Sequence, residues 1–189
     1  PVKSVAEFIA YARTQPGKLN FASAGSGSSL HLAGELFKSM AKVDLLHIPY
    51  KGGAPATLDL LSGHVTLMFN GMPVTLPHVK AGKLRALAVT GAKSTPLVPG
   101  VPTMAETGIR NVEVPSGQGL LMPAGTPRDI VSRVNAAINQ ALATEEVKKA
   151  FMARGFTPAP NTPEGFGAFL QNEYQKYADL TARIQINLE

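Results

Sequence analysis

Residues 19–31 have the sequence LNFASAGSGSSLH, which predicts a buried strand, a tight loop and the start of a helix. The strand is expected over Leu19–Ser23, and Gly25 and Gly27 allow the chain to turn sharply after it. Apolar residues then recur at helical spacing from Leu32 to Met40. A strand that passes directly into a helix in this way is typical of an α/β protein.

The same alternation of helices and apolar strands continues on both sides of this stretch. Ser4 to Glu7 forms a capping-box pattern that predicts the start of a helix. Further strands are expected over Leu45–Ile48, Val65–Phe69 and Leu84–Val89, with a short helix over Pro55–Leu61 and another ending at Gly82. Because these strands are apolar throughout and joined by helices, they predict a parallel sheet with helices on both faces.

The second half of the chain has a different character. Residues 91–117 contain four prolines and several glycines, which predicts an irregular crossing segment. One more apolar strand is expected over Gly119–Met122. Helices are then expected to start at Thr126-Pro127, Thr144 and Thr162-Pro163. This part supplies helices but almost no strands, so we expect it to cover a sheet whose strands come from elsewhere.

Composition excludes several classes of function. The formal net charge of +5 favours anionic partners, but the basic residues are scattered, so nucleic acid is not expected as a partner. The chain has no cysteine, which rules out disulfides and thiolate metal sites. No apolar run approaches the roughly 20 residues that span a bilayer, so the protein is not expected to be membrane-embedded.

The loop after the first strand is suited to an anion. A helix that begins there has unpaired N–H groups in its first turn, and its dipole favours negative charge at that end. The hydroxyls of Ser28 and Ser29 could add hydrogen bonds to a carboxylate. The alternative is an ordinary strand-to-helix turn in which a serine serves only as the N-cap.

Two other loops are expected at the same edge of the sheet, because the carboxyl ends of parallel strands line the ligand crevice of such folds. The first contains Tyr50 and Lys51, and the second is the stretch from Thr66 to Gly71, again placed at a strand end. Tyr50 could offer a phenol and Lys51 a positive charge, although a surface turn with an exposed lysine explains the pattern equally well.

More specific chemistries do not fit the first loop. It lacks the third glycine of a dinucleotide-binding fingerprint, the Gly-Lys-Ser/Thr of a P-loop and the glycine spacing of a nucleophile elbow. His31 and Glu35 lie four residues apart on one helix, and with Ser28 they form the basis of an alternative hypothesis: an enzyme acting on a small organic acid. One histidine and one glutamate are too few for a metal site, and such a histidine is more often a structural hydrogen-bonding group.

Several motifs together resemble one known family, the Bug/TctC family of extracytoplasmic solute receptors. The motifs are Ala24–Ser28 with His31-Leu32 and Glu35–Phe37, Ile48–Gly53 with Pro55-Ala56 and Asp59–Gly63, Val101–Gly108, and Pro123–Pro127. They occur in order along essentially the whole chain.

The resemblance implies a fold like that of the type II periplasmic binding proteins, in which two lobes close on a ligand. Residues 1–117 would form the second lobe, and residues 118–189 would supply the crossing strand and the C-terminal helices of the first lobe. The N-terminal part of the family's fold is expected to be absent from this sequence, so the first lobe would be incomplete.

The implied function is a periplasmic receptor, not an enzyme, that captures a small carboxylate and delivers it to a tripartite tricarboxylate-type transporter or to a sensor. No cofactor or metal is implied. The family commonly has an acid at the position of Thr66, so a ligand ammonium is not expected there, and mono-, di- or aromatic carboxylates stay open. The expected ligand-binding residues are Ala24, Gly25, Ser26, Gly27, Ser28, Ser29, Tyr50, Lys51, Thr66 and Phe69.

Overall fold

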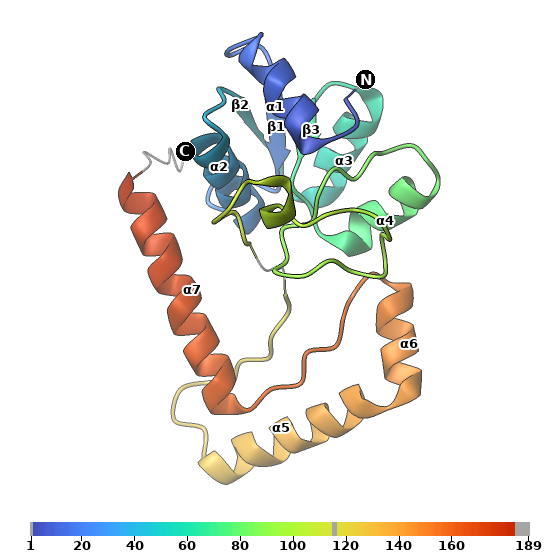
Figure 1. The fold of residues 1–189 in the computed structure, drawn as a ribbon. Coiled ribbons are helices and arrows are strands. Elements are labelled where there is room, and N and C mark those ends of the chain that lie inside the picture. Colours follow the sequence, from blue (N-terminus) through green and yellow to red (C-terminus); the bar gives the residue numbers. More distant parts are fainter. Residues whose placement is uncertain (1, 115–116, 184–189) are drawn as a thin grey trace. The chain divides into compact units, whose positions relative to one another are not determined.

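The computed structural model describes residues 2–114 and 117–183. The described chain divides into two compact units, residues 2–114 and residues 117–183. The first unit contains the sheet and its covering helices, and the second consists mainly of helices (Figure 1).

The sheet of the first unit has three parallel strands in the order β2-β1-β3. These are β1 (Asn20–Ser23), β2 (Leu46–Pro49) and β3 (Leu67–Met68). Ala22 of the middle strand pairs with Ile48 on one side and Met68 on the other. The predicted α/β class with a parallel sheet is confirmed.

Helices cover both faces of this sheet. The helices of the first unit are α1 (Val5–Arg13), α2 (Ser29–Ala41), α3 (Gly53–Ser62), α4 (Met72–Lys80) and the 3-10 turn η1 (Ala105–Thr107). Successive side chains of a strand point to opposite faces. Phe21 accordingly packs against α2, whereas Ala22 lies in a cluster with Ala56 of α3 and with Val65.

Two helix starts follow the local signals in the sequence. The Ser4 hydroxyl accepts the backbone N–H of Glu7 at 3.1 Å and so caps α1, as predicted. The other half of the capping box is shifted by one residue, because the Glu7 carboxylate accepts the N–H of Lys3 at 2.7 Å. The N-cap of α2 is Ser28.

The segment Leu84–Val89 is not a strand, so that prediction is wrong. Its backbone forms only one isolated parallel bridge, between Val89 and Thr103. The Val89 N–H donates to the carbonyl of Pro102 at 2.8 Å, and its carbonyl accepts the N–H of Met104 at 2.9 Å. An apolar pattern indicates burial, but a strand also needs a neighbour with free backbone groups along its length, and β3 is only two residues long.

The irregular crossing segment that follows is held by a few specific contacts. Thr103 and Glu106 form a reciprocal capping box, with the N–H of each donating to the other's side chain at 2.7 and 3.1 Å. The Thr90 hydroxyl donates to the carbonyl of Val114 at 3.1 Å. Val112 is fully buried, which ties the segment into the core of the first unit.

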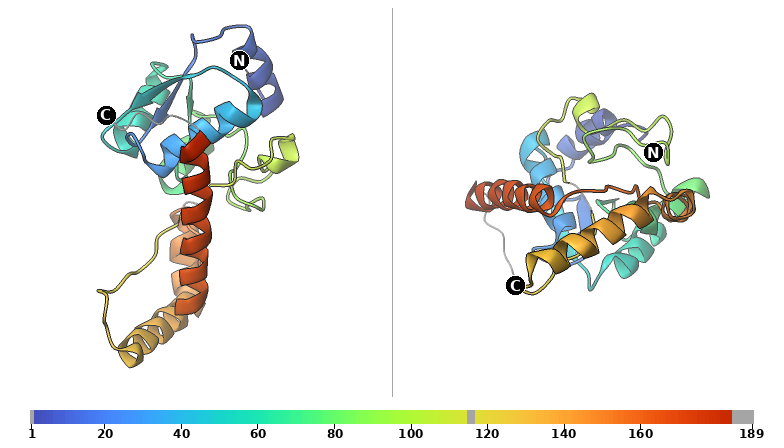
Figure 2. Two further views of the ribbon diagram at one scale, coloured as in Figure 1. Left: turned by 90° about the vertical axis from the view of Figure 1, so that its left-hand side faces the viewer. Right: turned by 90° about the horizontal axis from the view of Figure 1, so that it is seen from below.

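The second unit contains α5 (Arg128–Ala143), α6 (Glu145–Ala153) and α7 (Pro163–Arg183). Figure 2 shows α7 as a long, unbroken helix. Thr144 caps α6 as predicted. Asn135 and Asn139 of α5 both donate to the carbonyl of Asn161 at 2.9 Å, which fixes the start of α7.

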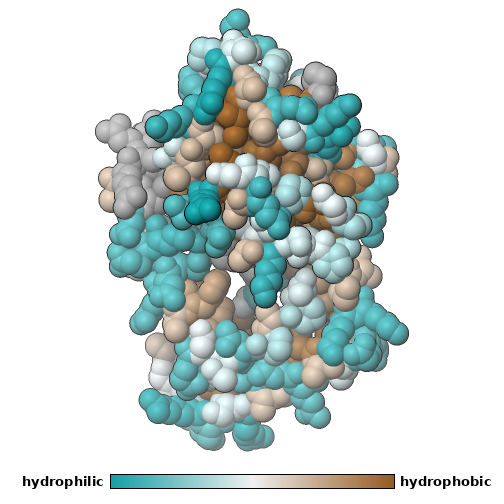
Figure 3. Space-filling view, viewed as in Figure 1, coloured by the Kyte–Doolittle hydropathy of each residue, from teal (hydrophilic) through white to brown (hydrophobic). Residues whose placement is uncertain are grey.

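The predicted strand Gly119–Met122 is also wrong. Leu120 and Leu121 are 67% and 75% exposed, and no strand among the described residues lies beside them. Strand formation depends on a partner, so the apolar sequence alone was insufficient. On the face shown in Figure 3, apolar residues gather over the sheet-containing unit, whereas hydrophilic residues prevail over α5. In the described ranges no helix is long and apolar enough to cross a membrane.

The contact between Phe21 and α2 gives a test of this packing. A Cβ on Gly34 would overlap the ring of Phe21, which is fully buried and cannot move aside easily. Glycine-to-alanine changes inside helices usually stabilise a protein by up to about 1 kcal/mol. We expect Gly34→Ala instead to destabilise by about 1–3 kcal/mol, as overpacking does, in the free energy of unfolding from chemical denaturation.

The matched control is Gly167→Ala in α7, where an added Cβ has open space. This variant is expected to be as stable as the wild type or up to about 1 kcal/mol more stable. A Gly34→Ala protein as stable as the Gly167→Ala protein would contradict the close packing of Phe21 on α2.

Candidate functional site

Three loops meet at the carboxyl edge of the sheet. Each strand is followed by a short loop and then a helix, so residues 24–28 lead into α2, residues 50–52 into α3 and residues 69–71 into α4. The second loop is hydrogen-bonded to the end of β1 and to the first loop. The Tyr50 N–H donates to the carbonyl of Ser23 at 3.1 Å, and the Gly52 N–H donates to the carbonyl of Ala24 at 3.3 Å. The parallel register therefore brings the predicted loops together.

A glycine makes this close approach possible. Gly25 has φ +128°, a conformation that side chains disfavour, and a Cβ there would lie 3.3 Å from the carbonyl oxygen of Tyr50. The requirement for glycine at this position follows from both the backbone conformation and the neighbouring loop.

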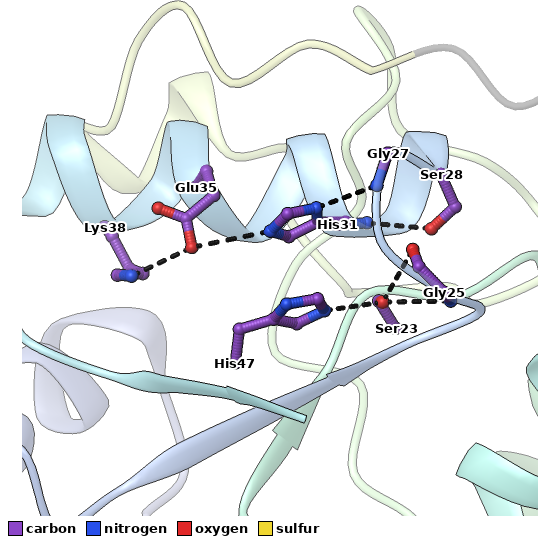
Figure 4. A network of polar contacts seen from close by, with 8 residues as sticks. All are labelled: Ser23, Gly25, Gly27, Ser28, His31, Glu35, Lys38 and His47. Atoms are coloured by element: carbon purple, nitrogen blue, oxygen red, sulfur yellow. Dashed lines mark hydrogen bonds and ion pairs between the residues drawn. The ribbon is translucent and has the colours of Figure 1, made fainter. Parts of the chain in front are cut away.

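The loop of residues 24–29, called the serine loop below, is held by its own hydrogen bonds (Figure 4). The Gly25 N–H donates to the Ser23 hydroxyl at 3.1 Å, and the Gly27 N–H donates to Nδ1 of His31 at 3.0 Å. The Ser28 hydroxyl accepts the N–H of His31 at 3.2 Å as the cap of α2. The N–H groups of Gly25, Gly27 and His31 are therefore already paired within the chain.

The donors left for a ligand lie at the very start of α2. The N–H groups of Ser29 and Leu30 have no acceptor within the helix, by the geometry of a first turn. Ser29 is exposed, and its hydroxyl makes no hydrogen bond with the described part of the chain. The positive end of the α2 dipole reinforces this small group of donors.

Two stacked histidines lie beneath the serine loop. The rings of His31 and His47 are 3.8 Å apart at an interplanar angle of 7°, and Phe21 stacks on His47 at 4.9 Å. Burial, together with the neighbouring His31 and Lys38, lowers the pKa of His47 to about 4. Burial also lowers the pKa of His31, although the Glu35 carboxylate acts in the opposite direction. Both rings are therefore neutral at pH 7.

Asn70 links the second and third loops, and the sequence analysis missed it. Its amide donates to the Thr57 hydroxyl of α3 at 2.9 Å, and its Oδ1 accepts the Gly71 N–H at 2.8 Å, where α4 begins. A Cβ on Gly53 would lie 3.1 Å from the same oxygen. An asparagine next to a glycine indicates a turn, and only its place directly after a strand at this edge could have marked it as a site residue.

The other predicted residues are only partly brought together. Tyr50 turns toward α3, where its hydroxyl donates to the Asp59 carboxylate at 2.6 Å, and this hydrogen bond raises the pKa of Tyr50. Lys51 is exposed beside the serine loop. The Phe69 ring packs on Phe37 of α2, with ring centroids 5.8 Å apart.

Thr66 does not lie at this edge. Its N–H donates to Oδ1 of Asn20 at 2.7 Å, and Asn20 is the first residue of β1. Because the loops follow the last residues of the strands, the structure places Thr66 at the opposite end of the sheet from the serine loop.

The geometry does not support the alternative of a Ser28–His31–Glu35 enzyme. The Ser28 hydroxyl caps the backbone of His31 instead of meeting its ring, and Nδ1 of that ring already accepts an N–H. The other nitrogen, Nε2, lies 3.8 Å from Glu35. No base is thus aimed at the serine hydroxyl. Within the described ranges, no group of three or more His, Asp or Glu side chains could hold a metal ion.

Comparison with known proteins shows the family. The chain belongs to the family described as the tripartite tricarboxylate transporter family receptor, TctC, which matches residues 1–186. The resemblance to Bug/TctC receptors in the sequence is confirmed, and the family consists of solute-binding receptors, not enzymes.

Individual relatives agree with this assignment. The "UPF0065 protein in tcbD-tcbE intergenic region" of Pseudomonas sp. is 38% identical over 98% of this chain and 55% of its own length. A protein of R. palustris solved with adipate has a TM-score of 0.89 and 35% identity, covering 96% of this chain and 61% of that one.

MatC from Rhodopseudomonas palustris, solved with bound malate, has a TM-score of 0.84 and 32% identity over 95% of this chain and 62% of MatC. These neighbours confirm the periplasmic-binding-protein fold. The chain spans a little over half the length of the first of these relatives and about three fifths of the two solved structures.

The role of Asn70 can be measured. Asn70→Ala removes the hydrogen bonds to Thr57 and Gly71, so we expect a loss of about 1–3 kcal/mol in the free energy of unfolding from chemical denaturation. Asn172→Ala, at an exposed position of α7, is the control and should change stability by less than about 0.5 kcal/mol. Equal stability of the two variants would show that Asn70 does not tie these loops together.

Proposed function

We propose that this chain forms the carboxylate-binding part of an extracytoplasmic solute receptor. The observation that carries the proposal is the start of three helices, α2, α3 and α4, at one edge of the sheet. The first-turn N–H groups and dipoles of three helices there favour an anion.

The three helix starts are not equally engaged. The caps of α3 and α4 are Gly52 and Gly71, and neither makes a side-chain capping hydrogen bond. Pro55 and Pro73 in the first turns have no N–H, which leaves Gly53 and Ala54 as the first donors of α3 and Met72 as that of α4. We assign Ser29 and Leu30 of α2 to a ligand carboxylate because exposed Ser29 adds a hydroxyl to these N–H groups, and exposed Lys51 adds positive charge.

The class of ligand follows from the same chemistry. Unpaired N–H groups and a hydroxyl recognise a carboxylate, and the described residues offer no aspartate or glutamate at the three loops to pair with an ammonium. The two solved relatives were found with adipate and with malate, and both ligands are dicarboxylates. A small mono- or dicarboxylate is the ligand we propose, and an aromatic carboxylate is compatible with the same donors.

The wider role proposed for the whole protein rests on the family. The receptor would work in the periplasm and pass its carboxylate to a tripartite tricarboxylate-type transporter or to a sensor. Residues 1–117 would form one lobe of the receptor, and residues 118–189 would return to complete the other. The similarity in fold to longer periplasmic receptors supports this division.

Binding by the full-length protein tests the proposal. Isothermal titration calorimetry against acetate, malate, adipate and benzoate should show saturable binding of at least one of them at pH 7.5. Adipamide has nearly the same shape as adipate without its charge, and it should not bind, because the helix starts select for an anion. Binding of none of the four, or equal binding of adipamide and adipate, would contradict a carboxylate receptor.

The position of the site gives a second prediction. Ser29→Asp places a negative charge at the start of α2, where it stabilises the helix but repels a bound carboxylate. We expect the affinity for the best ligand of the panel to fall at least tenfold, since two like charges at about 4 Å repel by several kcal/mol at an effective dielectric constant of about 20.

The control carries the same charge at the other end of the sheet. Thr66→Asp lies beside Asn20 at the start of β1, so it should leave the affinity within about twofold of wild type. If Thr66→Asp weakened binding as much as Ser29→Asp, the ligand would not sit at the carboxyl edge.

A further inference from the structure

Two histidines connect the serine loop to the core. His31 accepts the N–H of Gly27 at 3.0 Å, and Nε2 of His47 lies 2.7 Å from the Ser23 hydroxyl, which in turn accepts the N–H of Gly25 at 3.1 Å. Figure 4 shows both rings beside the loop, between α2 and the strands, one ring from α2 and one from β2. Both loop glycines are thus held, directly or through Ser23, by the imidazole pair.

The hydrogen bond from Gly27 requires a particular form of His31. A ring nitrogen can accept a backbone N–H only when it carries no proton itself. His31 is therefore neutral, with its proton on Nε2, which faces Glu35 at 3.8 Å. A second proton on Nδ1 would place two N–H donors opposite each other and break the contact with Gly27.

The surroundings favour this neutral form. From α2, the Glu35 carboxylate is within reach of the ring but also accepts Lys38 Nζ at 2.8 Å, so its charge is shared. From β2, His47 stacks on His31 at 3.8 Å, which makes a charge on either ring costly for the other. From β1, the packed side chain is the uncharged Phe21, 6.3 Å away between ring centroids.

We propose that His31 and His47 are the positioning residues of the carboxylate site, which as neutral rings hold the serine loop in its ligand-binding shape. Protonation of His31 releases Gly27, loosens the loop and weakens capture of the ligand. This inference rests on the proposed carboxylate function and adds to it a dependence on the protonation state of a residue that does not touch the ligand.

Two substitutions at position 31 separate the hydrogen bond from the ring. In His31→Asn, the amide oxygen takes the place of Nδ1 and can accept the Gly27 N–H, but the side chain does not titrate. In His31→Leu, no acceptor remains. At pH 7.5, we expect the affinity of His31→Asn for the best carboxylate of the panel to stay within about threefold of wild type, and that of His31→Leu to fall about tenfold or more.

The pH profile is the decisive measurement, because a purely structural role would not change it. Burial lowers the pKa of His31 below the ordinary value of a histidine, so the ring is neutral at pH 7.5 and takes up a proton only in more acidic solution. Wild-type affinity should therefore fall severalfold between pH 7.5 and pH 5, and the fall should be smaller in His31→Asn measured with the same ligand. Because the ligand is the same, its own titration cancels in this comparison.

His78→Asn is the control, since this histidine lies in the last turn of α4, at the end away from the loop of residues 69–71. It should follow the wild type at both pH values. Chemical denaturation of each variant and nitrogen NMR of wild-type His31 accompany the binding data, and the NMR should show a proton on Nε2 and none on Nδ1.

The outcomes distinguish the two proposals. If the wild-type protein binds carboxylates but His31→Leu binds as tightly, or His31→Asn loses affinity with acid as the wild type does, the positioning role is overturned and the receptor function stands. If His31→Leu does not fold, a proton on Nδ1 of wild-type His31 would overturn it in the same way. If the wild-type protein binds no carboxylate, the proposed function fails and this inference fails with it.

Discussion

Phe21 occupies the middle strand with its ring fully buried, and α2 crosses it at a residue that has no side chain. The same ring stacks on His47, which in turn stacks on His31. The position of α2 over β1 is thereby fixed at the point where the helix begins, and with it the direction of the first-turn N–H groups. The packing of Phe21 therefore helps to position, through the two stacked imidazole rings, the N–H groups that we assign to the ligand.

Burying two histidines next to the proposed anion site has an electrostatic consequence. Charged rings would attract a carboxylate, yet the buried and stacked arrangement lowers both pKa values and keeps the rings neutral. In the site we propose, attraction for the ligand is therefore left to the helix starts and to exposed Lys51, while the histidines act as hydrogen-bonding groups. In the same way, the Tyr50 hydroxyl donates its hydrogen bond to Asp59, so this donor is not available to the proposed ligand.

Features set by local sequence were predictable, and features set by partners were not. Ser4 and Thr144 were expected to begin helices, and each caps one, because capping depends on residues within one turn. Leu84–Val89 and Gly119–Met122 have the composition of strands, but strand pairing depends on a neighbour that composition does not reveal. The serine loop was located correctly, whereas its internal hydrogen bonds were not foreseen.

The side-chain contacts missed at the site share one property, which is that they join residues from different strands or helices. His31 and His47 meet because β1 and β2 are parallel neighbours, and Asn70 reaches Thr57 across the starts of two helices. Once these contacts are made, most polar side chains at the edge are occupied by one another. In the proposed site, recognition is then left chiefly to backbone N–H groups, which can bind the carboxylate of any such ligand. These N–H groups keep their direction only while the side chains packed against the loop stay in place.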